Sequence, residues 1–320
     1  MRDALTARAT GTGGLGTRAY ALALLLVLVA LLPSARPPAV VAGETPAEVL
    51  LRLDDIGMNH AVNTAMKRVA DAGIPFSASV LFVAPWHQEA VEMLRAHPQI
   101  SIGVHLALNS EWSGYRWGPV LGRTAVPSLV DGDGYFLPST REFLGHAFDP
   151  AEVERELEAQ ITRALGSGLK VDYVDHHMGT AVATPELRAI VERLAARHGL
   201  ALVGTLGEST ATLWSAPIES KRETLLTHLS RMRAGGLNVL VFHVAEATPE
   251  MNALVDRNAA RMNWRGGPPT AGRHRQAELD ALLSPEFAAA RKDGQFRLAT
   301  YRDVVAARSS KPRQRLEDPR

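Results

Sequence analysis

Short apolar runs that suit β-strands alternate with amphipathic, helix-like segments along most of this chain, and this alternation constrains the fold most strongly. The predicted strands are Val49–Leu53, Ala78–Val83, Ser101–Leu106, Val171–Val174, Ala201–Val203, Val239–Phe242 and Phe296–Ala299. The predicted helices are Asn59–Ala72, His87–Ala96, Ala151–Leu165, Pro185–His198, Ile218–Ala234 and Gln276–Asp293. Strands that alternate with helices usually pair in parallel. We therefore predict a single α/β domain, a distorted barrel of about seven parallel strands.

Several classes of protein are disfavoured by what the sequence lacks. No Gly-x-Gly-x-x-Gly follows the first predicted strand and no phosphate-binding loop occurs, so a nucleotide-binding sheet is not expected. The formal net charge is only +1, and we expect no nucleic-acid partner because such proteins concentrate basic residues. The chain has no cysteine, which excludes disulfides, thiolate metal ligands and a lipid-modified cysteine.

The amino-terminal residues have the anatomy of a secretory signal peptide. Basic residues precede an apolar run, Ala19–Leu32, and the small residues Val40-Val41-Ala42 offer a cleavage site. We expect export to the periplasm or the medium, with the signal over residues 1–42, the folded domain over 43–307 and a flexible polar tail over 308–320. Alternatively the segment stays uncleaved and anchors the protein, which would then contact the membrane only there.

Carboxylates and histidines recur at the ends of four predicted strands. They are Asp54 and Asp55 after the first strand, His105 in the third, Asp175, His176 and His177 after the fourth, and His243 after the sixth. The carboxyl ends of parallel strands in a barrel converge on one mouth. Taken singly, such residues more often shape turns or form buried hydrogen bonds. Their recurrence at one edge favours a common site.

One carboxylate and two imidazoles suit a divalent metal that keeps open positions for water and substrate. Ligands of oxygen and nitrogen without sulfur favour zinc, with magnesium, manganese, cobalt or nickel as alternatives. A metal polarises a carbonyl and a bound water, and a second carboxylate can serve as general base. The residues thus indicate metal-assisted hydrolysis, but they leave the bond that is cleaved open.

Two long irregular segments interrupt the alternation, Asn109–Pro138 and Arg257–Arg275. Loops of this length in a domain are often functional. Their aromatic residues could stack on sugar rings, or could only hold the loops against the domain. The candidate substrate-binding residues are Trp112, Tyr115, Trp117 and Trp264.

Taken in order, these motifs resemble those of the YdjC-like carbohydrate deacetylases, which include chitooligosaccharide and hopanoid-biosynthesis deacetylases. The resemblance runs from about Val49 to Val304 and rests on short motifs. These are Leu53-Asp54-Asp55-Ile56-Gly57 with Asn63 soon after, Gly103-Val104-His105-Leu106, Val174-Asp175-His176-His177, Val241-Phe242-His243 and Thr300-Tyr301-Arg302-Asp303-Val304. No single motif is specific, but their order and spacing are.

The resemblance implies a distorted barrel of the polysaccharide-deacetylase kind that hydrolyses an N-acetyl group on an amino sugar or glycan. It implies that Asp55, His105 and His177 bind the metal. Asp54 would be the general base and His243 the catalytic histidine on the oxyanion side. Asp175 and His176 would then support the ligands from behind.

The chain also departs from the family pattern. Met178-Gly179-Thr180 follow His177 where further histidines are usual, and Val244 follows His243 where proline is usual. Two other functions therefore stay open: hydrolysis of another amide or an ester, and glycan binding without catalysis on the same scaffold.

Overall fold

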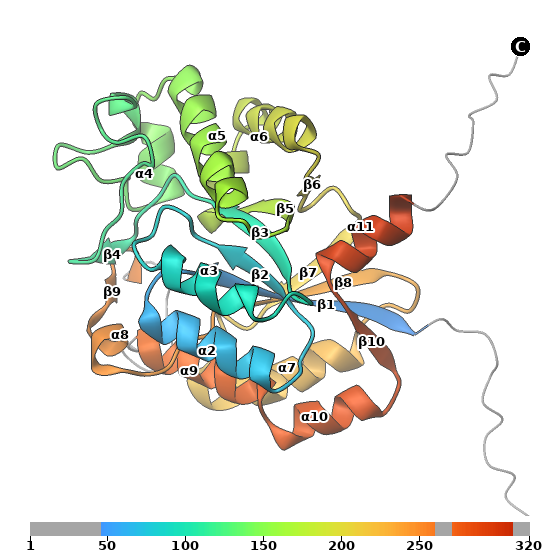
Figure 1. The fold of residues 1–320 in the computed structure, drawn as a ribbon. Helices are drawn as coiled ribbons and strands as arrows, with labels where there is room; N and C mark the ends of the chain where they lie inside the picture. The colour runs from blue at the N-terminus through green and yellow to red at the C-terminus, as the bar shows by residue number, and fades with distance from the viewer. Residues whose placement is uncertain (1–45, 260–270, 310–320) are drawn as a thin grey trace, which may run out of the picture. The chain divides into compact units, whose positions relative to one another are not determined.

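The computed structural model describes residues 46–259 and 271–309, which belong to one unit (Figure 1). The predicted signal peptide, Trp264 and the tail from residue 310 lie outside the described residues. Arg308 and Ser309, which we predicted to begin the tail, are the last residues of a helix instead. Among the described residues no helix has the length and apolar character needed to cross a membrane.

A parallel sheet forms the centre of the fold, as the alternation predicts. Its strands are β1 (Ala47–Ile56), β2 (Ser77–Val80), β3 (Ser101–Leu106), β5 (Val171–His176), β6 (Ala201–Leu202), β7 (Glu208–Thr212), β8 (Leu237–Phe242) and β10 (Phe296–Ala299). The order is β6-β5-β3-β2-β1-β8-β7, and β10 pairs with the first half of β1. Within the described residues β6 and β7 do not pair with each other, so the curled sheet is an incomplete barrel. The predicted distorted barrel is confirmed.

Five of the six predicted helices each correspond to one helix, and the described residues contain three further helices that were not predicted. The helices follow in chain order. They are α2 (His60–Asp71), α3 (His87–Arg95), α4 (Thr140–Gly145), α5 (Pro150–Gly166), α6 (Pro185–His198), α7 (Lys221–Ser230), α8 (Pro249–Ala253), α9 (Ala271–Leu282), α10 (Pro285–Lys292) and α11 (Tyr301–Ser309). The predicted helix Gln276–Asp293 is wrong as one element. It divides into α9 and α10 because the Ser284 hydroxyl caps a new helix that starts at Pro285.

One predicted strand was too long, and one strand of the parallel sheet was not predicted. The predicted strand Ala78–Val83 stops at Val80. The Leu81 amide makes the last hydrogen bond to β1, to the Ile56 carbonyl (2.8 Å), and a turn closed by the Ala84 amide on the Leu81 carbonyl (3.1 Å) then directs the chain out of the sheet. The strand β7 was not predicted at all. Its sequence Glu-Ser-Thr-Ala-Thr is polar because β7 lies at the end of the strand order, and it pairs in parallel with β8.

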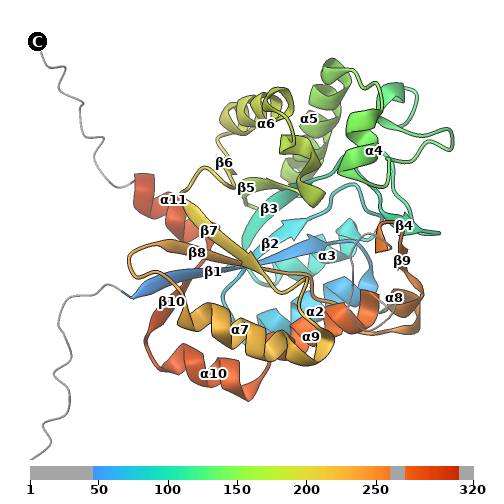
Figure 2. The same ribbon diagram turned by 180° about the vertical axis from the view of Figure 1, so that it is seen from behind.

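Two apolar cores lie on the opposite faces of the sheet. Val49, Leu51 and Leu53 of β1 belong to the large core shared with the surrounding helices, whereas Leu50 belongs to a smaller core inside the curl. The inner core also contains Tyr301 and Val304 of α11. Figures 1 and 2 show α11 beside the strand ends remote from β4 and β9. The inner face is therefore filled at its amino end, which leaves the carboxyl end for a site.

Two short strands roof that carboxyl end. β4 (Trp112–Ser113) and β9 (Val255–Asp256) pair antiparallel, with Trp112 opposite Asp256. The two strands come from the first long loop and from the segment just before the second. Segments far apart in the sequence are thus joined above the strand ends.

Candidate metal centre

The end of β1 carries Asp54 and Asp55 into the same cavity, although neighbours on a strand normally point to opposite faces. The register between β1 and β2 shifts between Leu53 and Ile56. Asp55 itself has a φ of 63°, a left-handed conformation that non-glycine residues adopt rarely and often at functional sites. The irregularity brings both carboxylates to the cavity wall.

Asn63, which follows the first of the sequence motifs, holds the turn after β1. The Gly57 amide donates to Asn63 Oδ1 (2.8 Å), and Asn63 Nδ2 donates to the Trp86 carbonyl (3.1 Å). Gly57 has a φ of 89°, and a Cβ there would lie 3.0 Å from the backbone of His87. Glycine and asparagine at these positions thus fix how β1 ends.

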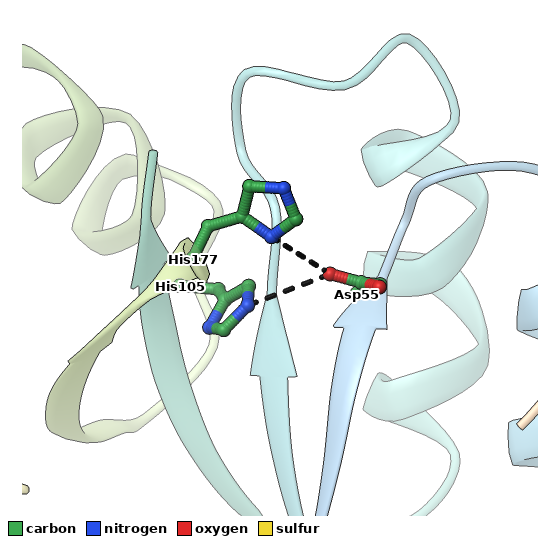
Figure 3. Close-up of side chains that lie close together, drawn as sticks. All are labelled: Asp55, His105 and His177. Atoms are coloured by element: carbon green, nitrogen blue, oxygen red, sulfur yellow. Dashed lines mark ion pairs between the residues drawn. The ribbon is translucent and has the colours of Figure 1, made fainter. Parts of the chain in front are cut away.

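Asp55, His105 and His177 come together in one buried cluster (Figure 3). Oδ1 of Asp55 lies 3.1 Å from His177 Nδ1 and 3.4 Å from His105 Nε2. This oxygen has no hydrogen-bond partner among the described residues. One carboxylate oxygen thus faces two imidazole nitrogens at close range, which fits a cation with one oxygen and two nitrogen ligands.

The far nitrogens of both histidines are held by carboxylates. His105 Nδ1 donates to Asp175 Oδ1 (2.9 Å), and His177 Nε2 donates to Glu111 Oε2 (2.8 Å). Such partners fix the ring orientation of metal-binding histidines and make them better ligands. The place of Asp175 agrees with its predicted support of a ligand. Glu111 was not predicted, because in sequence it is one acidic residue in a long loop.

The metal-free cluster carries protons that a cation would replace. Burial alone would lower the pKa of His105, but the Asp175 and Asp54 carboxylates outweigh it and raise the pKa to about 9. Burial would also lower the pKa of His177, but the Glu111 and Asp55 carboxylates raise it well above its usual value. Burial would raise the pKa of Asp55, yet the Arg275 guanidinium and His177 hold it well below its usual value. Metal ligands must be deprotonated, so binding would release these protons.

A second set of residues, Asp54 with His105 and Asp175, also meets the distance condition for a cation. However, Arg52 donates to both oxygens of Asp54, from Nε at 2.7 Å and from Nη2 at 2.8 Å. Arg52 Nε also lies 3.3 Å from Asp175 Oδ2. Both oxygens of Asp54 accept from Arg52, and those of Asp175 accept from His105 and Ser79, whereas Arg275 occupies only Oδ2 of Asp55. The trio with Asp55 is therefore the better cation site.

His243 follows β8 and lines the same cavity. Its backbone amide donates to Glu278 Oε2 (2.7 Å), and the other oxygen of Glu278 accepts from Lys221 Nζ (2.9 Å). The His243 ring lies 5.0 Å from that of Trp214, centroid to centroid. Burial lowers the pKa of His243, so its ring is neutral at pH 7.

The cavity of about 280 Å³ collects most of the predicted site residues and several that were missed. Its lining residues are Asp54, Asp55, His105, Glu111, Trp112, His177, Met178, Trp214, His243, Asp256 and Arg275. Glu111, Met178, Trp214, Asp256 and Arg275 were not predicted as site residues, because none of them belongs to a motif of residues typical of such a site. A pocket of this size suits part of a saccharide chain.

The other predicted residues lie off the cavity wall. Trp117 is buried beside His177, with ring centroids 5.8 Å apart, and its indole N–H donates to the Asn109 carbonyl (2.7 Å). The Tyr115 hydroxyl donates to the Met58 carbonyl. These contacts favour a structural role, in which Trp117 and Tyr115 hold the loop and the His177 ring in place, rather than direct contact with a substrate. His176 is half-buried and is not among the lining residues.

Fold and site together define a class: an incomplete parallel α/β barrel with a buried carboxylate–histidine cluster, able to hold a metal ion, at the carboxyl ends of its strands. The chain belongs to the YdjC-like protein family, whose model matches residues 48–293.

Individual proteins are similar over different lengths. A carbohydrate deacetylase of Thermus thermophilus is 32% identical over 286 residues, which cover 81% of this chain and 94% of that protein. A carbohydrate deacetylase of Brevibacillus brevis is 30% identical over 47% of this chain, a match spanning 56% of that protein. The fold resembles a solved protein of Enterococcus faecalis V583, provisionally named for cellobiose-phosphate cleavage. The TM-score is 0.62 at 23% identity, covering 81% of this chain and 99% of that one.

Proposed function

We propose that this protein is a metal-dependent hydrolase that removes N-acetyl groups from an amino sugar or glycan. The observation that carries the proposal is the buried trio of Asp55, His105 and His177, in which one carboxylate oxygen faces two oriented imidazoles. Similarity to proteins named carbohydrate deacetylases supports the acetylated saccharide as substrate.

The trio would hold one divalent cation, with zinc favoured by the mixed oxygen and nitrogen ligands. When bound, the cation supplies Lewis-acid polarisation of the amide carbonyl and of a water molecule. The protein contributes a desolvated pocket and two histidines whose rings are already fixed by Asp175 and Glu111.

Asp54 is the candidate general base. Its carboxylate lines the same cavity, and Arg52 fixes it through both oxygens. Each carboxylate oxygen keeps a second lone pair, so the fixed group can still accept a proton from the attacking water. The proton that Asp54 takes from the water would be returned to the leaving nitrogen, and His243, whose neutral ring lines the same cavity, would donate a hydrogen bond to the developing oxyanion.

The test compares two neighbouring substitutions. Purified protein with zinc should release acetate from N-acetylated glucosamine oligosaccharides. Asp54→Asn should keep the metal and lose turnover by about 100-fold or more, because a general base typically contributes that much. Asp55→Asn should lose the metal itself, measured by isothermal titration and by metal analysis after gel filtration.

Three results would contradict this assignment. If Asp55→Asn binds zinc as tightly as the unaltered protein, the trio is not the metal centre. Tight binding of zinc and oligosaccharide without acetate release would instead support the glycan-binding alternative, and faster release from acetate esters than from amides would support an esterase.

We also propose that the chain is exported, with residues 1–42 as the signal. Support comes from the basic residues and apolar run in its sequence alone. Amino-terminal sequencing of protein secreted by a bacterial host should find a start near residue 43. Full-length protein retained in the membrane fraction would favour the uncleaved anchor.

A further inference from the structure

Arg275 is a buried cation in the wall of the candidate metal centre. It lies in α9, with only 2% of the residue exposed. Its Nη2 donates to Asp55 Oδ2 (2.6 Å), the carboxylate oxygen that does not face the histidines. Arg275 thus occupies Oδ2 of Asp55 and leaves Oδ1, which faces the histidines, to bind a cation.

Two indole rings hold the guanidinium in place. Its carbon Cζ lies 5.5 Å from the ring centre of Trp112 and 5.6 Å from that of Trp214. Cations at these distances from aromatic rings are attracted to them, more strongly where water is excluded. Trp112 comes from the roof strand β4 and Trp214 follows β7, so separate parts of the fold converge on this group.

The remaining donors of Arg275 are unused. Nε and Nη1 are buried and have no hydrogen-bond partner among the described residues. A buried donor without an acceptor destabilises the protein, more so when it is charged. Because Arg275 lines the cavity, an acceptor on a bound molecule would remove that cost.

We propose that Arg275 is a substrate-binding residue that donates from Nε and Nη1 to oxygen atoms of the bound saccharide, while Nη2 stays on Asp55. The proposal rests on the proposed function, which supplies the saccharide. In a planar guanidinium, Nε and Nη1 lie on different edges and point in different directions. They therefore suit two separate oxygens better than the two oxygens of one carboxylate.

The charge of the cavity points to neutral acceptors. Arg275 lines it with Asp55, and Nη2 of Arg275 lies 2.6 Å from Asp55 Oδ2. The charge of the guanidinium is therefore already matched by a buried carboxylate. An anionic substituent would find no unpaired cation at Arg275, so hydroxyl or carbonyl oxygens are the expected partners of Nε and Nη1.

The experiment measures binding in a background that does not turn over. Zinc-loaded Asp54→Asn protein is titrated with N-acetylchitotriose, alone and combined with Arg275→Lys. Lysine keeps the positive charge near Asp55 but lacks the planar fork. The matched control is Arg273→Lys, the same exchange at an exposed position of the same helix. Arg275→Lys should weaken saccharide binding roughly ten-fold or more. Arg273→Lys should leave it unchanged.

Zinc affinity and melting temperature are measured for the same proteins, because a purely structural role would change them. We expect Arg275→Lys to bind zinc within about three-fold of its parent. In the Asp54→Asn background, N-acetylglucosamine should bind more tightly than N-acetylmuramic acid, which carries a carboxylate.

Three outcomes would overturn the proposal: equal saccharide binding by the two lysine variants, a parallel loss of zinc and saccharide in Arg275→Lys, or tighter binding of the acidic sugar. Absence of saccharide binding in every variant would overturn it as well. Because binding is read without turnover, failure of acetate release in the unaltered protein would refute the proposed reaction and leave a result on Arg275 intact.

Discussion

At the scale of single residues, the surroundings of Asp55 suit its side chain to bind a cation. Its backbone takes a left-handed conformation in an irregular strand end. One of its oxygens is occupied by Arg275, and the other faces His105 and His177. Asp54, next to it in sequence, is instead held by Arg52 through both oxygens. Two adjacent aspartates thus have different surroundings, which is the basis for proposing them as ligand and base.

Glu111 is the residue whose role is easiest to test at this scale. Its carboxylate accepts from His177 Nε2 at 2.8 Å. Glu111→Gln should weaken zinc binding by about 10–100-fold, as is typical when a partner of a metal-binding histidine is altered. The measurement is competitive titration against a chromophoric chelator, with Glu142→Gln, an exposed glutamate on α4, as control. Unchanged affinity in Glu111→Gln would show that His177 does not depend on this contact.

At the scale of secondary structure, the strands position the site by bringing residues of different strands to one edge. Alternation places Ser101, Gly103 and His105 of β3 on the inner face, against Tyr173 and Asp175 of β5. The phenol of Tyr173 and the carboxylate of Asp175 share Ser79 of β2 as partner, at 2.9 and 2.8 Å. A small residue at position 103 is what lets Tyr173 lie flat across β3.

Gly103→Ala tests this packing. A Cβ at Gly103 would lie 2.2 Å from the Tyr173 ring, so either the ring or the strand must shift, at a cost of about 1–3 kcal/mol for an overpacked core. The free energy of unfolding from urea titration should fall by that amount. Gly166→Ala is the control, because a Cβ there meets nothing within 4 Å and α5 should gain slightly. Equal stability of both variants would refute the packing argument.

At the scale of the whole molecule, the candidate metal centre spans distant elements, so cation binding there would be linked to the stability of the fold. The site joins β1, β3, the end of β5, the roof strand β4 and helix α9, so its ionisation affects contacts between elements remote in sequence. A cation that binds only the folded chain stabilises it by mass action. The raised pKa values of His105 and His177 set how the metal-free protein responds to pH.

Chelated, metal-free protein should lose stability as the pH rises. The pKa of His105 is about 9 in the folded protein against an ordinary 6.5. Its contribution is therefore fully present below pH 6.5 and disappears as the pH rises through 9, a loss on the order of 1–3 kcal/mol. Melting temperatures between pH 6 and 9.5 should fall with chelator present and change little with saturating zinc, because the ligands are then already deprotonated. Parallel curves with and without zinc would contradict the linkage.

Much of this protein was predictable because its determinants are local. The strand and helix periods, the Pro and Gly positions at helix ends, and the carboxylates and histidines at strand ends are all properties of neighbouring residues. They predicted the parallel α/β barrel and brought Asp54, Asp55, His105, His177 and His243 to one cavity. The break at Ser284-Pro285 was missed although its signal was local, since a capping serine before proline marks a new helix.

The tertiary structure decided what depends on contacts between distant segments. Arg275 reaches Asp55 across 220 positions of sequence, and Glu111 reaches His177 across 66. No periodicity or short motif records such pairs. The different surroundings of Asp54 and Asp55 likewise depend on which cation lies beside each: Arg52 from the same strand, or Arg275 from α9. Sequence fixes which strand end a side chain occupies, because that follows from the period of the chain, whereas its charge partners follow from how the elements pack.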